Sequence, residues 1–304
     1  MNDTAAPSYE KHHALLLATR PKTLAISVVP VVVSTLLAYS LGVKIDWEIA
    51  FFLLLTALSV QIGTNFVNDA LDFKKGADDP YSLGPFRATK SGKVSHREMM
   101  QWSVVAFALG AFFCIPLILQ GGWSITLLLI VSILSGYLYT GGPKPLAYCG
   151  LGEVFAFLFF GVAITGASYY LQTGYLDLKA LLVGVQIGCL ETAILAINNL
   201  RDYHGDARVH KRTLAVRFGQ KFAKMEITLL LLFPFALCLL WFYYSYFFVA
   251  ILPLSVIALA IDLIGNIRRY EPSALYNQFL YKGAALHLSF GLLMGVGFWL
   301  QKSV

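Results

Sequence analysis

The sequence predicts an all-α integral membrane protein in which residues 1–304 form one bundle of nine transmembrane helices. Two observations lead to this prediction. Apolar residues make up 58% of the chain and charged residues only 13%, whereas a soluble domain carries about 25% charged residues. The apolar residues also gather into runs of roughly 20, the length that one helix needs to cross a bilayer.

Nine apolar runs qualify as spans, and the segments between them are too short to form a further domain. Residues 1–20 are expected to form a short cytoplasmic tail, because no signal-peptide cleavage pattern follows the first apolar run. The spans are predicted at 24–42, 48–68, 101–119, 123–140, 152–172, 180–200, 226–243, 246–265 and 282–300.

The basic residues predict the orientation of the bundle. With the N-terminus in the cytoplasm, nine spans place 20 of the 23 Lys and Arg residues on the cytoplasmic side, which agrees with the positive-inside rule. Only Lys44, Lys179 and Lys302 fall outside. We therefore expect a multi-pass protein of the inner (plasma) membrane with its C-terminus outside. This bias and the anionic lipid surface explain the net charge of +6, so the charge does not indicate a nucleic-acid partner.

Carboxylate and amide side chains gather at the cytoplasmic ends of the second and sixth predicted spans. Residues three or four positions apart lie on one face of a helix, so each span should present a column of oxygen atoms. Like charges at this spacing repel each other, and burial at a membrane boundary raises the free energy further. A neutralising cation is therefore expected. The two clusters consist of Asn65, Asn68, Asp69 and Asp72, continued by Asp78 or Asp79, and of Asn198, Asp202 and Asp206.

Mg²⁺ is the cation that this set of oxygen atoms fits. It takes only one or two carboxylates in most sites and completes its shell with water and substrate phosphate. Two facing columns, several Mg²⁺ ions and a diphosphate therefore form a consistent set. The alternative is a pair of solvated helix ends in which Asn and Asp act as caps, which explains one cluster more easily than two. The predicted metal ligands are Asn68, Asp69, Asp72, Asp78, Asn198, Asp202 and Asp206.

Lys and Arg residues near the clusters are candidates for holding phosphate. Arg87 and Lys90 lie in a turn-rich loop, and Lys144 follows a Gly-Gly-Pro turn that fixes the backbone. For three other cations the positive-inside rule is the stronger explanation and phosphate binding the alternative: Arg20, Lys22 and Lys211.

These residues resemble the UbiA superfamily of intramembrane aromatic prenyltransferases. The resemblance covers nearly the whole chain and includes nine helices, the paired Asp-rich motifs and a Tyr–Lys element between them, which is Tyr139 and Lys144 here. Asn198, Asp202 and Asp206 match the family pattern Asn-x-x-x-Asp-x-x-x-Asp in full.

The first motif departs from the family pattern at one position. Asn68 and Asp72 match it, but Gly76 occupies the third position, so Asp78 or Asp79 is the expected substitute. The residues around this motif are similar to the menaquinone branch, whose acceptor is 1,4-dihydroxy-2-naphthoate. So is the segment 20–24, which reads Arg-Pro-Lys-Thr-Leu.

The resemblance implies a Mg²⁺-dependent enzyme that transfers a polyprenyl group from polyprenyl diphosphate to 1,4-dihydroxy-2-naphthoate, with loss of carbon dioxide, to give demethylmenaquinol. Glu191, which lies within the sixth span, is a candidate for binding or deprotonating the aromatic acid, or else a structural buried acid. The candidate catalytic residues are Asp69, Asp72, Asp202, Asp206, Lys144 and Arg87. The candidate substrate-binding residues are Asn65, Asn68, Asn198, Tyr139, Arg20, Lys22, Lys90, Lys211 and Glu191.

Two other functions remain open from the sequence. A different branch of the superfamily would use 4-hydroxybenzoate or haem as the acceptor. A cation-coupled transporter would also carry intramembrane acids, but it would place them near the bilayer midplane, on broken helices. The dense acids here lie at one surface, which favours chemistry on a substrate that arrives from the cytoplasm.

Overall fold

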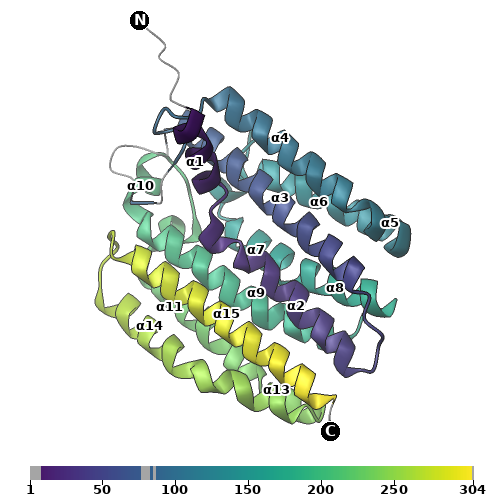
Figure 1. Cartoon of the computed structure of the whole chain (residues 1–304). Coiled ribbons are helices and arrows are strands. Elements are labelled where there is room, and N and C mark those ends of the chain that lie inside the picture. The colour runs from purple at the N-terminus through teal and green to yellow at the C-terminus, as the bar shows by residue number, and fades with distance from the viewer. Residues whose placement is uncertain (1–7, 77–82, 85–86, 303–304) are drawn as a thin grey trace, which may run out of the picture.

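The computed structural model describes residues 8–76, 83–84 and 87–302, and the regular structure within these ranges is helical throughout. The predictions for Asp78 and Asp79 fall outside the described residues, as does the side chain of Lys22. The long helices lie side by side with similar tilt in one bundle (Figure 1).

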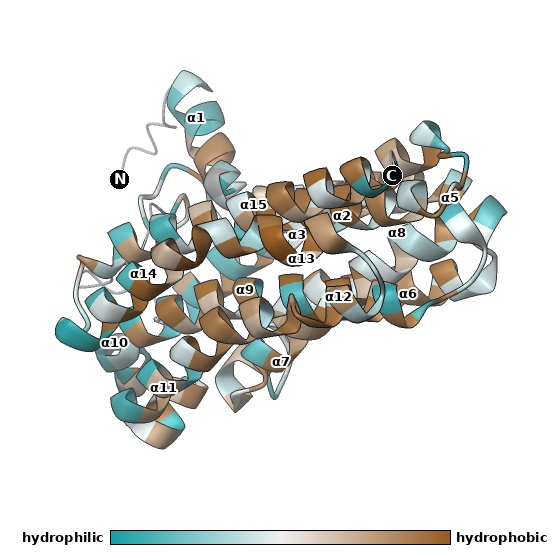
Figure 2. Ribbon diagram, turned by 90° about the horizontal axis from the view of Figure 1, so that it is seen from below, coloured by the Kyte–Doolittle hydropathy of each residue, from teal (hydrophilic) through white to brown (hydrophobic). Residues whose placement is uncertain are grey.

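The elements follow one another as α1 (Ser8–Ala18), η1 (Pro21–Thr23), α2 (Ala25–Ser40), α3 (Trp47–Lys74), α4 (His96–Phe113), α5 (Ile115–Gly121), α6 (Trp123–Leu138), η2 (Leu146–Cys149), α7 (Gly152–Ala156), η3 (Phe157–Ala163), α8 (Ile164–Thr173), α9 (Leu178–Arg201), α10 (Tyr203–Arg208), α11 (Leu214–Leu237), α12 (Leu240–Tyr243), α13 (Phe247–Ile251), η4 (Leu252–Val256), α14 (Ile257–Arg269) and α15 (Tyr276–Gln301). Ribbons coloured by hydropathy are mostly brown through the middle of the bundle, with teal concentrated near α10 and near α5 (Figure 2). This is the pattern expected of helices that cross an apolar layer.

Each predicted span coincides with a helix or with consecutive helices of the described chain. Six such units are long and apolar enough to cross a membrane, and α4 with α5 makes a seventh if the pair, which bends by 41°, is one span. α2 and α6 have 16 residues each, a length of about 24 Å against a hydrocarbon core of about 30 Å. The all-α membrane fold is therefore confirmed, while the count of nine spans stays a prediction.

The main apolar core lies around α2, α9 and α15. α15 packs against α2 and α9, and α9 packs in turn against α11 and η3. Leu37, Ile197 and Phe290 represent this core and are fully buried. Because α9 is surrounded on several sides, polar groups on it are shielded from lipid and face other helices or a cavity.

A π-helical segment, η3, brings α9 close to its neighbour. π-helical turns are rare and occur frequently at functional sites. Gly161 of this segment lies against Gly184 and Gly188 of α9, so that a Cβ atom added at Gly161 would stand 2.5 Å from the Gly188 Cα atom and 2.6 Å from the Gly184 carbonyl oxygen. The close approach places aromatic residues of η3 beside the polar side chains of α9.

We predict that Gly161→Ala destabilises the protein by about 1–3 kcal/mol, because backbone atoms cannot move aside for the new methyl group. The measurement is the thermal unfolding midpoint in detergent. Gly166→Ala on the next turn is the matched control, since an added Cβ there meets only a Leu176 methyl group at 3.8 Å. Equal midpoints for the two variants would contradict the prediction.

Candidate active site

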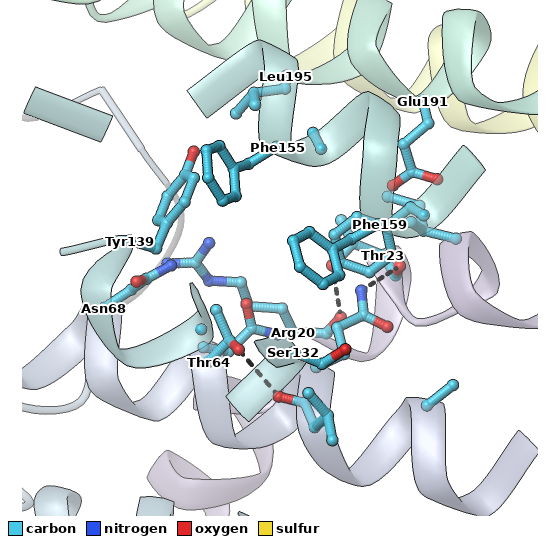
Figure 3. Close-up of a pocket in the computed structure, with 18 of the residues that line it drawn as sticks. Arg20, Thr23, Thr64, Asn68, Ser132, Tyr139, Phe155, Phe159, Glu191 and Leu195 are labelled. Carbon is cyan, nitrogen blue, oxygen red and sulfur yellow. Dashed lines mark hydrogen bonds between the residues drawn. The ribbon is translucent and has the colours of Figure 1, made fainter. Parts of the chain in front are cut away.

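A cavity of about 610 Å³ opens between α3, α6, η3, α9, α15 and the segment before α2. One end is lined by polar and charged side chains such as Asn68, Asp72 and Lys211, and the other by apolar ones such as Leu117 and Ile125. In Figure 3 the guanidinium of Arg20 extends toward Asn68 and Tyr139, with the aromatic rings of Phe155 and Phe159 beyond. The cavity therefore joins a charged compartment to an apolar one.

Asp72 reaches the charged compartment because α3 continues to Lys74. Its Oδ1 accepts a hydrogen bond from the Tyr148 hydroxyl at 3.1 Å, and its Oδ2 lies 3.5 Å from Arg87 Nη2. Asp72 is thus a buried carboxylate that already has cationic and hydroxyl neighbours.

Asp69 has a different position from Asp72 on the same helix. Its two carboxylate oxygens accept the backbone N–H groups of Ala88 and Thr89 at 3.0 and 2.9 Å, and its side chain is not part of the cavity wall. This contact anchors the loop that carries Arg87. A metal-binding role for Asp69 stays a prediction, and the geometry gives it a loop-anchoring role in addition.

The two asparagines of the first cluster line the cavity and join α3 to other segments. Asn65 Nδ2 donates to the Thr19 carbonyl at 3.0 Å and so holds the chain that leads to Arg20. Asn68 Oδ1 accepts from the Thr140 hydroxyl just after α6. Arg20 itself has left-handed backbone angles (φ 56°, ψ 60°), a conformation that is unfavourable for a non-glycine residue and clusters at functional sites.

The second cluster is organised by a residue within it, Arg201. Its guanidinium donates to both oxygens of Asp202 at 2.9 and 2.6 Å, to Asn198 Oδ1 at 2.8 Å and to Asn277 Oδ1 of α15 at 2.8 Å. Arg201 is only 3% exposed. The expectation of one continuous column is wrong here, because α9 ends at Arg201, Asp202 caps it, and Asp206 belongs to the short helix α10.

Asp206 and Lys211 form a buried ion pair, with Lys211 Nζ 3.3 Å from Asp206 Oδ1. Burial raises the pKa of Asp206 to about 6; Lys211 lowers it, while Asp202 and Asp72 raise it further. Burial opposes the charged form of Lys211, but Asp206 and Asp72 raise its pKa overall. Asp206 Oδ2 is buried and has no hydrogen-bond partner among the described residues. One oxygen of Asp206 is therefore paired with Lys211, and the other is left without a partner.

Tyr148, in η2, connects the two clusters. Besides the hydrogen bond to Asp72, its ring lies under the ammonium groups of Lys75 at 4.5 Å and Lys211 at 5.9 Å. Its carbonyl accepts the backbone N–H of Arg212 at 3.2 Å. One aromatic side chain thus contacts cations that follow each Asp-rich helix.

The structure brings nine of the predicted site residues to the cavity wall. They are Arg20, Asn65, Asn68, Asp72, Arg87, Tyr139, Glu191, Asn198 and Lys211. The side chains of Asp69, Lys90, Lys144, Asp202 and Asp206 are not part of the wall. Lys144 is exposed in its turn, whereas Lys211 lines the cavity, and its role in binding phosphate stays a prediction.

The sequence analysis missed Tyr148, Lys75 and Arg201. Arg201 was visible as a cation inside an acidic motif, where a buried ion pair is the natural expectation. Nothing local marks Tyr148, since its partners lie far away in the sequence.

The donor set fits Mg²⁺ on chemical grounds. No group of three His, Cys, Asp or Glu side chains among the described residues converges on one point. Mg²⁺ does not require such a group, because one or two carboxylates suffice when phosphate and water complete the shell. The unpartnered oxygen of Asp206 and the neighbouring Asp72 supply hard oxygen ligands of this kind.

Comparison with known proteins gives the family. The model of the UbiA prenyltransferase family matches residues 27–288. A 1,4-dihydroxy-2-naphthoate octaprenyltransferase from Bacillus subtilis is 33% identical over 223 residues, which is 73% of this chain and 70% of that protein. A protein of the same name from Haemophilus influenzae is 34% identical over 250 residues, covering 77% and 80%.

Solved structures support the same fold. A UbiA homologue from Archaeoglobus fulgidus bound to GPP and Mg²⁺ superposes with a TM-score of 0.64, covering 92% of this chain and 99% of that one at 16% identity. At that identity the likeness concerns the fold.

We predict that Tyr148→Phe lowers prenyl-transfer activity by several-fold and that Tyr148→Leu lowers it further. Phe loses only the hydrogen bond to Asp72, worth about 1.5–3 kcal/mol to a charged group at most, but it keeps the ring under Lys75 and Lys211. Leu loses the cation–π contacts as well. The measurement is kcat at saturating substrates, and identical activity in both variants would contradict the bridging role of the ring.

Proposed function

The chain belongs to the UbiA prenyltransferase family, and from this premise we propose that it transfers a polyprenyl group from polyprenyl diphosphate to 1,4-dihydroxy-2-naphthoate with loss of carbon dioxide. One observation carries the proposal: a single cavity joins a compartment of carboxylates and cations to an apolar compartment with aromatic walls. A diphosphate and an isoprenoid tail have this division of polarity in one molecule.

The charged compartment suits the diphosphate. Lys211 and Arg87 each lie against a carboxylate, Asp206 and Asp72 respectively, and both cations line the cavity. They can turn from these partners toward phosphate oxygens with little further desolvation, since their side chains are only 15% and 14% exposed for Arg87 and Lys211. Arg20 adds a third cation at the cavity wall.

We further propose that Asp72, Asp202, Asp206, Asn68 and Asn198 hold Mg²⁺ together with the diphosphate. The ion, when bound, supplies electrostatic stabilisation for the charge that grows on the leaving diphosphate. The Archaeoglobus homologue described as bound to GPP and Mg²⁺ supports this assignment.

Beyond the charged compartment, aromatic side chains suit the allylic cation. The rings of Phe155 of α7 and Phe159 of η3 have centroids 5.9 Å apart, with planes at 20°, and both line the cavity with Tyr139. Aromatic faces attract cations by about 0.5–2 kcal/mol each. The same faces exclude water, which would otherwise capture the cation.

The acceptor assignment rests on relatives. The names of the Bacillus and Haemophilus proteins favour 1,4-dihydroxy-2-naphthoate over 4-hydroxybenzoate or haem. The proposed orientation places the charged compartment on the cytoplasmic side, because the basic residues cluster there.

We predict that purified protein prenylates 1,4-dihydroxy-2-naphthoate with release of carbon dioxide, and that turnover stops when Mg²⁺ is removed. The assay supplies a polyprenyl diphosphate and measures product by chromatography, with 4-hydroxybenzoate in parallel. Product from 4-hydroxybenzoate alone would keep the enzyme class and refute the acceptor. No product from either acceptor in folded protein would refute both.

We predict that Asp72→Ala and Asp202→Ala each lower kcat by at least about 100-fold, in the range found when a group that stabilises transition-state charge is removed. Asp262→Ala is the matched control, because Asp262 also has an asparagine four positions away in the sequence but is exposed and pairs with Lys282 at 2.6 Å. Circular dichroism and elution volume establish that each variant is folded. Near-normal activity of Asp72→Ala would exclude the proposed site.

A further inference from the structure

Two ionisable side chains meet deep in the bundle, away from the charged compartment. Glu191 of α9 is 4% exposed and His287 of α15 is 1% exposed. Glu191 Oε2 lies 3.9 Å from His287 Nε2, and neither atom has a hydrogen-bond partner among the described residues. Buried polar atoms without partners are rare and costly, so their presence needs a reason.

Glu191 also faces the cavity. It belongs to the cavity wall, and Figure 3 shows its carboxyl group pointing toward Thr23 and Phe159. His287 is not part of the wall and stands behind Glu191. The carboxyl group of Glu191 therefore lies between the cavity on one side and the imidazole of His287 on the other.

Helix geometry sets the depth of this carboxyl group. Glu191 precedes Asn198 by seven residues, which places both on one face of α9 and about 10 Å apart along its axis. An aromatic ring placed between them has the allylic carbon and diphosphate on one side and Glu191 on the other.

Gln61, which lines the same cavity, already has partners for its side-chain amide. Gln61 Oε1 accepts from the Ser27 hydroxyl at 2.7 Å, and its Nε2 donates to the Thr23 carbonyl at 3.1 Å. Glu191 accepts no hydrogen bond from the described residues, and with Oε2 turned toward His287 its Oε1 is the oxygen left for a ligand.

We infer that Glu191 binds a ring hydroxyl of the aromatic acceptor and takes its proton during the reaction, and that His287 is a positioning residue that holds the Glu191 carboxyl group. The inference rests on the proposed function. A carboxylate beside a hydroxyl makes the ring more electron-rich as the cation approaches, which is the effect of a general base.

The proton balance of the proposed reaction suits a buried base. The bond between the allylic carbon and the diphosphate oxygen breaks, and diphosphate leaves with the electron pair. The ring carbon that bears the carboxylate forms a bond to the allylic carbon, while the adjacent hydroxyl loses its proton to Glu191 and becomes a carbonyl. The bond to the carboxylate carbon then breaks, carbon dioxide leaves, and its electron pair restores the aromatic ring. The oxygen takes the proton back from Glu191. No net proton is released, so Glu191 needs no path to water.

The first test uses the unaltered protein and a modified acceptor. An acceptor whose hydroxyl beside the carboxylate-bearing carbon is methylated has no proton to give. We expect wild-type protein to turn it over about 100-fold more slowly than 1,4-dihydroxy-2-naphthoate, within the range of general-base effects. Equal rates with the two acceptors would overturn the inference and leave the proposed function intact.

The second test compares variants with both acceptors. Glu191→Gln should lower kcat about 100-fold with the natural acceptor and cause no further loss with the methylated one. It should leave the affinity for an unreactive prenyl thiolodiphosphate unchanged. His287→Gln, which keeps a donor near the carboxyl group, should lose less activity than His287→Phe.

Non-additivity separates positioning from general destabilisation. Glu191→Gln combined with His287→Phe should be no slower than Glu191→Gln alone, because both changes act on one group.

Thr192→Val is the matched control, since Thr192 is buried next to Glu191 and its hydroxyl donates to the Gly188 carbonyl of its own helix. Equal losses in Glu191→Gln and Thr192→Val, or weakened thiolodiphosphate binding, would assign Glu191 a structural role and overturn the inference. A wild-type protein that is inactive with every aromatic acceptor would instead refute the proposed function, and this inference with it.

Discussion

The neutralisation of charge buried at the edge of a membrane is the constraint on which the rest of this structure depends. Arg201, 3% exposed, is held by Asp202, Asn198 and Asn277. Removing one partner from a buried ion pair typically costs about 3–5 kcal/mol, because the other charge is left uncompensated. One guanidinium therefore joins the end of α9, the residue before α10 and the first turn of α15.

The same constraint explains how such a site can accept a highly charged substrate. Two cations that line the charged compartment are already largely buried and paired, Lys211 with Asp206 and Arg87 with Asp72. Under the proposed function, the diphosphate replaces the carboxylates as the partner of the cations. Mg²⁺ at the same time replaces the cations as the partner of the carboxylates. The net charge of the compartment changes little, and the large desolvation penalty is met during folding and not during binding.

The sequence predicted the helical membrane fold and the two acid clusters, because hydrophobic run length and i,i+4 spacing are local properties. It did not predict the contacts that join the clusters. Tyr148 binds Asp72 from 76 positions away, and Arg201 reaches Asn277 across 76 positions. The sequence also did not predict the different positions of Asp69 and Asp72. Asp69 binds the loop at Ala88 and Thr89, and Asp72 lines the cavity; this depends on the path of that loop.

A buried pair of Glu and His within a membrane can also be part of a proton pathway, which the transporter hypothesis would require. Such a pathway needs a continuous row of polar groups from the pair to both membrane surfaces. Among the described residues near the pair, Leu190, Leu286 and Phe290 are fully buried and apolar. The next polar side chain deeper on α9, Gln186, is engaged by Trp241 and the Pro234 carbonyl, on the side of α11. A proton that reaches Glu191 therefore has the cavity as its exit, which is the arrangement required for a base that returns the proton it takes.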